Sequence, residues 1–530
     1  MDSRQFKDAA KASIDHIVNY YENITDHSVV SQVEPGYLRK MLPESPPQDG
    51  ESWDVIRQDI DSKIVPGLTH WQSPNFFAFF PCPASYPSLL GELYSAAFSA
   101  ASFNWICSPA VTELETIMLD WVAQATGLPD VYHSTGPTRG GGVIQGSASE
   151  AVLTMMVAAR DKYLRDTLPD PASVTEDEFE DLDMRKRSRL VALGSEAAHS
   201  STKKAARILG VRYVAVPTSS ASNFAMTGDA LKQTLEECKG KGLEPFFLTA
   251  TLGTTDTCAV DDFGAIADVL TKFRATPSAG NTNGAATTNG DTNGTATAPA
   301  ARKGEVWVHV DAAYAGSALV TPEAQESVGV QHLAHFHSFN FNMHKWLLTN
   351  FDASCVFVAD RSWLESALGS ELHVYRNTYS DGGLVTDYRN WQIPLGRRFR
   401  SLKIWFVMRC YGVEGLRGYI RRGVSQGEMF AGWLRERPDL FEIVTGPAFA
   451  LVVFRLAPKG VESEERRNEL TRALYEEVNR SGKIWVTSTV LEGKFAIRVM
   501  TGNITTEEVH VKAAHELILA TAEKVVKGQH

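Results

Sequence analysis

The sequence lacks long apolar runs, an excess of basic charge and paired cysteines. No apolar run reaches the ~20 residues of a membrane-spanning helix, so we expect no membrane partner. The 52 basic residues are outnumbered by 63 acidic ones, and the net charge of −11 argues against nucleic acid as a partner. The six cysteines form no CxxC pair and show no metal-ligand spacing. We therefore expect reduced thiols, a cytoplasmic protein and no metal site.

The chain of 530 residues is too long for one simple core and is expected to form several domains. Residues 1–95 are predicted to be a helical arm, because apolar residues such as Phe6 and Ile14 recur at helical spacing. This arm cannot easily form a core alone, so we expect it to pack on another subunit. In residues 96–402 strands alternate with helical stretches, which predicts a mainly parallel sheet between helices. Residues 403–530 are predicted to form a small α+β domain.

Two segments of the large domain depart from this alternation. Residues 161–189 are strongly charged, and we expect an exposed, irregular connection there. Residues 275–303 are repeats of Asn, Gly, Thr and Ala. They cannot bury a core, so we expect a disordered insert inside the large domain.

The stretch Ser338–Trp346 is predicted to be a buried strand, with alternating Phe and Asn, that runs directly into the pair His344-Lys345. Burying an ammonium group without a partner is costly, and a lysine so placed usually has a lowered pKa. Its free amine can then attack carbonyls and form Schiff bases. A surface lysine at a strand end is the plainer alternative.

Three further features belong to the same α/β framework. The run from Gly140 to Glu150 is a glycine-rich segment, a short strand and a small-residue turn before a helix. It suits either a phosphate at the helix start or a simple cap by Ser147 or Ser149. Asp311 ends a buried strand and needs a cationic or hydrogen-bonding partner. His199 follows another strand, where a purely structural histidine is the alternative.

An aromatic segment broken by prolines, Trp71 to Pro83, lies earlier in the chain. Prolines exclude a central strand and a long helix, so an irregular loop is predicted. A core plug and a wall of a binding pocket fit this segment equally well.

A helix start suited to phosphate, a strand-end carboxylate and a reactive lysine together match the needs of pyridoxal phosphate. The chain resembles the group II pyridoxal-phosphate decarboxylases, specifically the aromatic L-amino acid decarboxylases, over nearly its whole length. The motifs that carry the resemblance are His70–Pro74, Phe103–Trp105, Ser108–Glu115, Gly142–Glu150, Ala198–Ser201, Ala250–Thr255, His309–Gly316, Asn342–Trp346 and Asp387–Leu402.

The resemblance implies a fold-type I enzyme with a mainly parallel seven-stranded sheet between helices. Lys345 would hold the cofactor, Asp311 would contact the pyridine nitrogen, and His199 would stack on the ring and help hold the substrate. The remaining residues implied in cofactor binding are Ala148, Ser149, Thr255, Ala313, Asn342 and His344. A loop tyrosine, Tyr375 or alternatively Tyr379, would protonate the substrate carbon.

The resemblance also implies a homodimer with shared active sites, which take Phe103 and the Leu395–Gly396 turn from the partner subunit. The residues implied in substrate binding are Trp71, Phe79, Phe80, Pro81, Cys82, Ala101, Phe103 and Gly396. Small residues at Ala101 and Gly396 favour tryptophan or 5-hydroxytryptophan, followed by tyrosine, dihydroxyphenylalanine and phenylalanine. The products would be the monoamine and carbon dioxide. The alternative is an aromatic aldehyde synthase on the same fold.

Overall fold

The computed structural model of the chain describes residues 1–275, 303–369 and 378–528. The chain forms two compact units, a smaller one of Met1–Pro83 with Arg422–His530 and a larger one of Ala84–Arg421. The division into domains 1–95, 96–402 and 403–530 stays a proposal.

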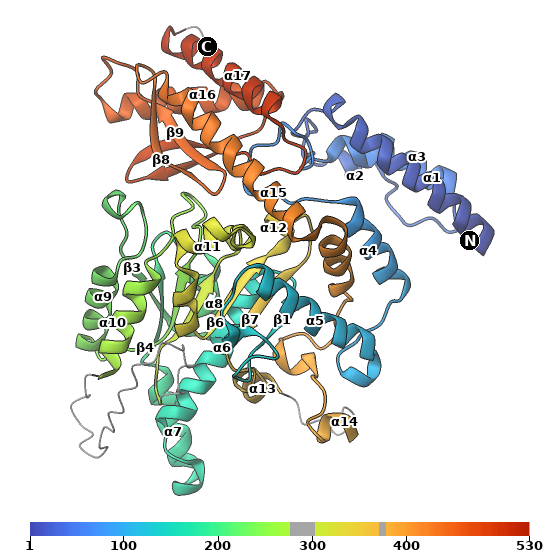
Figure 1. The fold of residues 1–530 in the computed structure, drawn as a ribbon. Helices are drawn as coiled ribbons and strands as arrows, with labels where there is room; N and C mark the ends of the chain where they lie inside the picture. Colours follow the sequence, from blue (N-terminus) through green and yellow to red (C-terminus); the bar gives the residue numbers. More distant parts are fainter. Residues whose placement is uncertain (276–302, 370–377, 529–530) are drawn as a thin grey trace. The chain divides into compact units, whose positions relative to one another are not determined.

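The larger unit is built on a seven-stranded sheet, which has the order β1-β7-β6-β5-β4-β2-β3 in the described part of the chain (Figure 1). The strands are β1 (Gly141–Gln145), β2 (Leu190–Ser195), β3 (Arg212–Val216), β4 (Glu244–Thr251), β5 (Trp307–Asp311), β6 (Ser338–Asn342) and β7 (Ser354–Val358). Only the pairings of β7, with β1 and β6, are antiparallel. The mainly parallel sheet predicted from the sequence is confirmed.

Helices cover both faces of this sheet because the chain crosses it in two directions. The connections through α6 (Ala148–Thr167) and α8 (Ser201–Leu209) run toward β3, whereas those through α9 (Gly228–Gly240) and α10 (Phe263–Ala275) run back. Right-handed crossovers therefore place the two pairs on opposite faces. The contacts of α6 with α8 and of α9 with α10 agree with this placement. The other helices of the unit include α4 (Tyr86–Ala97), α5 (Pro109–Ala125), α11 (Pro322–Val328), α12 (Met343–Trp346), α13 (Ser362–Leu368) and α14 (Thr378–Asp381).

The prediction of an irregular connection at residues 161–189 is wrong, because most of this segment is helical. Helix α6 continues to Thr167, and α7 spans Glu176–Arg187. The Thr175 and Glu178 side chains form a capping box at the start of α7. Its first turn is acidic and its last turn is basic, which complements the helix dipole. Charge placement, rather than an apolar face, stabilises this helix.

The insert predicted at 275–303 falls almost entirely on residues 276–302, which lie outside the described residues. The described chain ends α10 at Ala275 and starts β5 at Trp307.

The smaller unit contains a four-stranded antiparallel sheet of order β10-β11-β9-β8. Its elements are β8 (Phe441–Ala448), β9 (Leu451–Leu456), β10 (Thr487–Leu491), β11 (Lys494–Met500), α16 (Glu464–Arg480) and α17 (Glu508–Val526). Helix α15 (Ser401–Arg435) leads into this unit and is interrupted at Gly412, where φ is 62°. Apolar residues such as Phe454, Leu474 and Ile518 form one buried cluster between the sheet and the helices. The α+β architecture predicted for this end of the chain is confirmed, although β10 was not predicted.

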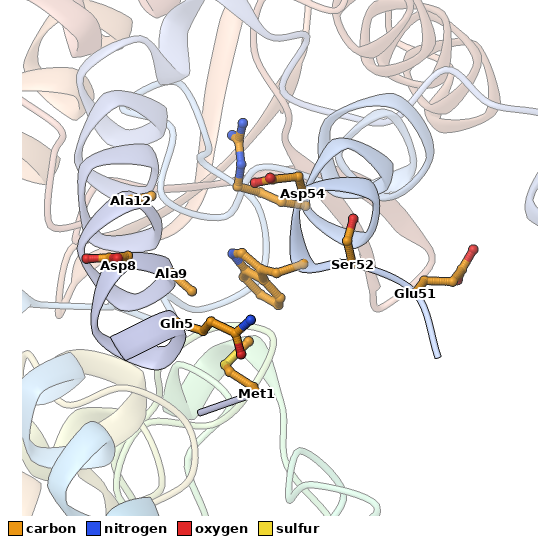
Figure 2. Close-up of a pocket in the computed structure, with 10 residues that line it drawn as sticks. Met1, Gln5, Asp8, Ala9, Ala12, Glu51, Ser52 and Asp54 are labelled. Atoms are coloured by element: carbon orange, nitrogen blue, oxygen red, sulfur yellow. The ribbon is translucent and has the colours of Figure 1, made fainter. Parts of the chain in front are cut away.

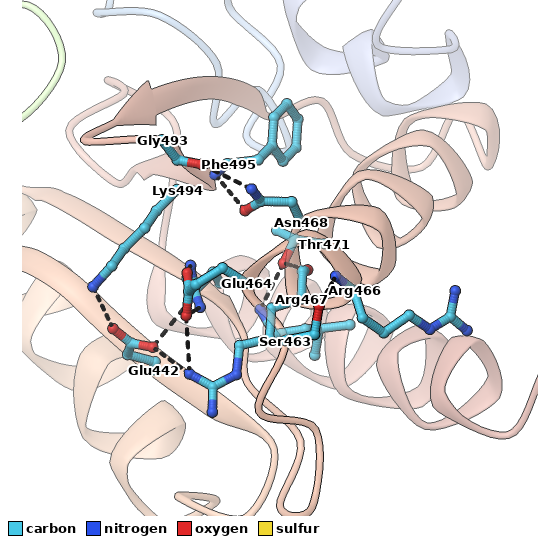
Figure 3. A network of polar contacts seen from close by, with 12 residues as sticks. Glu442, Ser463, Glu464, Arg466, Arg467, Asn468, Thr471, Gly493, Lys494 and Phe495 are labelled. Atoms are coloured by element: carbon cyan, nitrogen blue, oxygen red, sulfur yellow. Dashed lines mark hydrogen bonds and ion pairs between the residues drawn. The ribbon is translucent and has the colours of Figure 1, made fainter.

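A network of polar contacts lies on this sheet and includes Glu442, Glu464 and Lys494 (Figure 3). The Arg455 side chain is fully buried on β9 and donates two hydrogen bonds to Glu464, at 2.8 and 2.9 Å. Its Nε lies 3.2 Å from Oε2 of Glu442, which also pairs with Lys494 at 3.5 Å. The charge of Arg455 is therefore balanced by two carboxylates.

The N-terminal arm contains α1 (Ser3–Glu22), α2 (Tyr37–Met41) and α3 (Trp53–Asp59). Helix α1 has no buried residue, and Phe6 and Ile14 are 60% and 49% exposed. Figure 2 shows a small pocket between α1 and the Glu51–Arg57 segment. The apolar face of the arm thus lacks a cover within the described residues. None of the described helices is long and apolar enough to cross a bilayer.

Candidate active site

Polar residues gather at one edge of the large sheet. Strands β4, β5 and β6 end in Thr251, Asp311 and Asn342, and His199 follows β2. In the sheet register, Asp311 lies beside Thr251 on one side and Asn340 on the other. Because the carboxyl ends of parallel strands share one edge, this edge is where such a sheet binds ligands.

Lys345 lies on α12, the single helical turn that follows β6, so it stands three residues beyond the strand end. Its neighbours Met343, His344 and Trp346 are buried, whereas Lys345 keeps partial access to solvent. Burial lowers the pKa of Lys345, and the nearby Asp311 carboxylate and Cys258 thiol oppose this effect. The lysine therefore loses its proton more easily than an exposed one and becomes a better nucleophile.

Asp311 is 4% exposed, and its Oδ1 accepts a hydrogen bond from the backbone N–H of Ala313 at 3.0 Å. Two positions earlier on β5, His309 is fully buried, and burial lowers the pKa of His309 to about 4. The neutral His309 ring bonds Ser338 Oγ at 2.8 Å and Asn340 Oδ1 at 2.7 Å. Asp311 is thus preceded on β5 by a hydrogen-bonded, buried histidine.

His199 is held in one orientation by Ser201. The backbone N–H of Ser201 donates to Nδ1 at 3.2 Å, so the neutral ring carries its proton on Nε2. Burial lowers the pKa of His199, and the positive charge of Lys345 lowers it further, while Asp311 raises it. The structure therefore brings His199, Asp311 and Lys345 into one electrostatic environment, as the sequence predicted.

The start of α6 provides the site predicted to hold a phosphate. Ser147 is its N-cap, with its Oγ accepting from the backbone N–H of Glu150 at 3.2 Å. Ser149 is therefore not the cap, and it lies exposed in the first turn beside the buried Ala148. The Ser147 side chain caps the amide of Glu150 and not those of Ala148 and Ser149. Free first-turn amides and the helix dipole both favour an anion at a helix start.

The loop after β4, which carries Thr255, is fixed by a buried carboxylate. The two oxygens of Asp261 accept from the backbone N–H groups of Thr251 at 2.8 Å and Met226 at 2.7 Å. Burial raises the pKa of Asp261 to about 7. Gly253 adopts φ 84° in this loop, where an added Cβ would lie 2.5 Å from that of Ala315. Sequence reasoning gave no role to Asp261 or His309. His309 lies two positions before the end of β5, whereas Asp261 lies ten positions after the end of β4 and just before α10.

His344, predicted among the cofactor-binding residues, is a neutral ring. Its Nδ1 accepts from the backbone N–H of Ala353 at 2.8 Å. Burial, together with the charge of Lys345, lowers the pKa of His344 to about 4.

The strand ends leave hydrogen-bonding capacity for a ligand. Three buried atoms there, Thr251 Oγ1, Asn340 Nδ2 and Asn342 Oδ1, have no hydrogen-bond partner among the described residues. An unpaired buried polar atom is unfavourable by roughly 1–3 kcal/mol, which a bound polar group would relieve. Together with the lysine and the helix start, this edge fits pyridoxal phosphate. No cluster of His, Cys, Asp or Glu in the described part of the chain is arranged to hold a metal ion.

Two segments predicted to contribute to substrate binding lie side by side in the larger unit. The backbone N–H of Arg397, next to Gly396, donates to Ala101 O at 2.7 Å, and that of Arg389 donates to Phe103 O at 3.1 Å. Gly396 is exposed, and an added Cβ would meet nothing within 4 Å.

Of the two candidate tyrosines, Tyr375 lies outside the described residues. Tyr379 lies on α14, is 44% exposed and has its ring centroid 4.9 Å from that of Trp105.

The predicted aromatic wall belongs to the smaller unit, and its approach to Lys345 stays a prediction. Trp71 and Phe79 stack at 5.7 Å, and Phe79 also packs edge-on against Trp485 at 5.2 Å. Asn503 Nδ2 donates to the carbonyl of Trp71 at 2.9 Å. The segment is irregular, as its prolines predict. Trp485 and Asn503, which order the wall, carried no signal in the sequence because they follow it by more than 400 positions. The remaining wall residues are Phe80, Pro81 and Cys82.

Comparisons with known proteins agree with this site. Residues 35–457 match the pyridoxal-dependent decarboxylase conserved domain. The chain is 42% identical to phenylacetaldehyde synthase of Arabidopsis thaliana, over 98% of this chain and 96% of that one. It is 40% identical to aromatic-L-amino-acid decarboxylase of Rattus norvegicus, over the full length of both. The crystal structure of Oryza sativa TDC with PLP and tryptamine superimposes with a TM-score of 0.86, at 35% identity and 99% coverage of both chains.

The fold and site define a fold-type I enzyme whose cofactor is pyridoxal phosphate. Within that class, the chain belongs to the group II pyridoxal-phosphate-dependent decarboxylase family.

Proposed function

We propose that this protein removes the carboxylate of an aromatic L-amino acid and releases the monoamine and carbon dioxide. Tryptophan and 5-hydroxytryptophan are the preferred substrates, followed by tyrosine, dihydroxyphenylalanine and phenylalanine. The observation that carries the proposal is the grouping of Lys345, Asp311 and His199 at the carboxyl edge of the sheet, where Lys345 has a lowered pKa. The relatives named above, an aldehyde synthase and an aromatic-L-amino-acid decarboxylase, are consistent with this reaction class.

In this proposal each residue has a defined task. Pyridoxal phosphate, when bound, supplies an electron sink for the bond that breaks at the substrate α-carbon. Lys345 would hold it covalently, and the Asp311 carboxylate would keep its pyridine nitrogen protonated. Ala313 would lie against the ring and His199 would stack on it. The phosphate would bind at Ala148, Ser149 and Asn342, with Thr255 and His344 close to the cofactor.

The substrate side of the site would be apolar. Trp71, Phe79, Phe80, Pro81 and Cys82 would desolvate the carboxylate and so favour the loss of neutral carbon dioxide. Ala101, Phe103 and Gly396 would shape the space for the aromatic ring, and the small residues Ala101 and Gly396 would leave room for an indole.

Tyr375 would then deliver a proton to the α-carbon, which is the step that separates decarboxylase from aldehyde synthase. The 42% identity to phenylacetaldehyde synthase supports the alternative, an aldehyde synthase. The retained loop tyrosine and His199 favour the decarboxylase.

The proposed assembly is a homodimer with shared sites, in the cytoplasm. Apolar side chains left exposed on the larger unit support it, among them Phe98 at 61%, Ile393 at 51% and Leu395 at 43% exposure. Sedimentation of the holoenzyme is expected to give twice the mass of one chain, and a monomer at working concentration would contradict the assembly.

One incubation series tests the reaction. The holoenzyme is supplied with each aromatic amino acid, and amine, aldehyde, ammonia and peroxide are quantified by mass spectrometry and coupled assays. We expect amine to form without stoichiometric peroxide. We also expect tryptophan to have the highest kcat/KM of the amino acids supplied. Tyr375→Phe is expected to shift the product toward aldehyde, whereas Tyr379→Phe is the matched control and is expected to keep the amine. Aldehyde and peroxide from the wild type would favour the alternative.

A further inference from the structure

A buried ion pair lies at the base of the turn predicted to shape the substrate pocket. The carboxylate of Glu115, on α5, accepts from the guanidinium of Arg397, and both side chains are 1% exposed. The turn between Gln392 and Arg397 consists of four exposed residues, Ile393 to Gly396. A fully buried pair at the base of an exposed turn is costly to desolvate, and removing either partner would leave an unpaired buried charge.

The guanidinium of Arg397 bonds Glu115 through Nη2 and the first residue of this turn through Nη1. Its Nη1 donates to Gln392 Oε1 at 2.6 Å, and Gln392 Nε2 in turn donates to Pro394 O at 2.5 Å. The Tyr388 ring lies 4.6 Å from the guanidinium carbon and covers its face. The two ends of the turn are thus locked together through one planar cation, a geometry that lysine cannot reproduce.

The same pair connects the turn to two other parts of the larger unit. The backbone N–H of Arg397 donates to Ala101 O at 2.7 Å, which fixes the segment leading to Phe103. The Glu115 carboxylate also accepts from the backbone N–H of Ile144 on β1 at 2.8 Å. Strand β1 leads directly into the Ser147-capped start of α6.

We infer that Glu115 and Arg397 are positioning residues that fix Gly396 and Phe103 for substrate binding. This inference rests on the proposed function, because the role of Gly396 and Phe103 in the pocket is part of it. Neither Glu115 nor Arg397 needs to touch the substrate. Their effect passes through the turn and through the Ala101 carbonyl, and a misplaced pocket wall weakens binding and orientation.

The test uses the holoenzymes of Glu115→Gln, Arg397→Gln and the double variant. Each single change is expected to raise KM for aromatic amino acids about tenfold with kcat changed less than about threefold. The double variant is expected to raise KM no further than the single ones, because one interaction is lost in all three. Arg421→Gln breaks an exposed pair with Glu323 in the same unit and is the matched control, with KM unchanged.

A second readout does not depend on activity. Hydrogen exchange of the backbone amides in residues 101–105 and 389–397 is expected to speed up in Arg397→Gln and to stay unchanged in Arg421→Gln. Arg397→Lys keeps the charge and is expected to fold even if Arg397→Gln does not, with intermediate exchange and intermediate KM. Unchanged exchange and unchanged KM in both Arg397 variants would overturn the inference.

A mixed dimer shows which active site the turn serves. When Arg397→Gln and Lys345→Ala chains are co-expressed with different tags, the hybrid has one intact lysine, on the Arg397→Gln chain. If the turn acts on the partner's site, the intact lysine is served by the turn of the Lys345→Ala chain, which keeps Arg397. KM then returns to the wild-type value. A KM that stays raised would remove the shared site from the proposed function but leave the positioning role in place. If the wild type decarboxylates no aromatic amino acid, the proposed function fails and the exchange readout alone decides the inference.

Discussion

Lys345 in the larger unit and Arg455 in the smaller unit are both cationic side chains held among buried residues, yet their surroundings differ. Arg455 lies between two carboxylates and donates a bidentate pair of hydrogen bonds to Glu464, and this holds the pKa of Glu464 below its ordinary value. Lys345 has its pKa lowered by burial, although Asp311 is close enough to counteract part of the effect. Arg455 is paired with two carboxylates, whereas at Lys345 the effect of burial exceeds the attraction of Asp311 and the pKa is lowered.

The difference shows how a protein separates stability from reactivity. A permanently charged guanidinium with matched acceptors joins a strand to a helix and has no accessible neutral form. An amine that loses its proton readily is a nucleophile, and its burial lowers the stability of the fold around it. Substituting Lys345 should therefore lower mainly the catalytic activity, whereas substituting Arg455 should lower mainly the stability of the fold.

The largest effect is expected for Lys345→Ala. Turnover should fall by about a thousandfold or more, equivalent to about 4 kcal/mol of activation free energy, because the covalent anchor of the cofactor is lost. Amine formation is the measurement, and borohydride reduction followed by peptide mass spectrometry should find no cofactor on the peptide that contains position 345. Near-wild-type turnover would refute the proposed role of Lys345.

Arg455→Met is expected to destabilise the smaller unit by roughly 2–4 kcal/mol, since Glu442 and Glu464 lose their shared partner. Denaturant unfolding followed by tryptophan fluorescence measures this change. Arg466→Met is the control, because Arg466 pairs with Glu469 at the surface at 2.7 Å and should contribute only about 0–0.5 kcal/mol. Equal effects of the two substitutions would show that burial of the Arg455 pair has no consequence for stability.

The pH dependence of apoprotein stability provides a third contrast. The pKa of Lys345 is lower in the folded chain than its ordinary value, so the unfolded chain binds more protons between the two values. Stability should therefore rise with pH across this window, below an unfolded pKa of about 10.4, by at most about 1.4 kcal/mol per pH unit. Lys345→Met should be more stable than wild type near neutrality, and the difference should shrink as the pH rises. Parallel pH profiles of the two apoproteins would contradict this expectation.

The smallest effect is expected for Glu442→Gln, at about 0.5 kcal/mol, because Arg455 keeps its bidentate bond to Glu464. Glu464→Gln should be more harmful, because it weakens both hydrogen bonds. The order of the two midpoints in urea tests which carboxylate is the principal partner, and a reversed order would assign that role to Glu442.

Much of the architecture could be predicted because its signals are local. The strands Arg212–Val216 and Leu451–Leu456 were predicted from their mainly apolar sequences, with the same bounds that the structure gives them. Lys345, Asp311 and His199 were singled out because each lies at or after the end of a predicted strand. The other residues predicted to bind the cofactor rested on the family resemblance. Helix α7 was missed because its stability comes from end charges and a capping box, which a search for an apolar stripe overlooks.

The contacts that tie distant segments together could not be predicted. Glu115 and Arg397 are 282 positions apart, and nothing in their local sequences predicts that their side chains pair in the interior. The contact of Trp485 with Phe79 and the hydrogen bond from Thr251, at the end of β4, to Asp261 likewise could not be predicted. Burial and pairing of such groups are properties of the folded chain, whereas composition and periodicity report only on each segment alone.

The long connection between α10 and β5 joins the sheet at the start of β5, and the proposed active-site residues lie where β5 ends. Strands of a parallel sheet begin at one edge and finish at the other, so changes to this connection act at the opposite end of β5 from Asp311. A change in the length or composition of this connection is therefore expected to leave the surroundings of Asp311 unaltered. The same position offers a place to attach an affinity tag or a reporter domain internally, with both chain ends left unaltered.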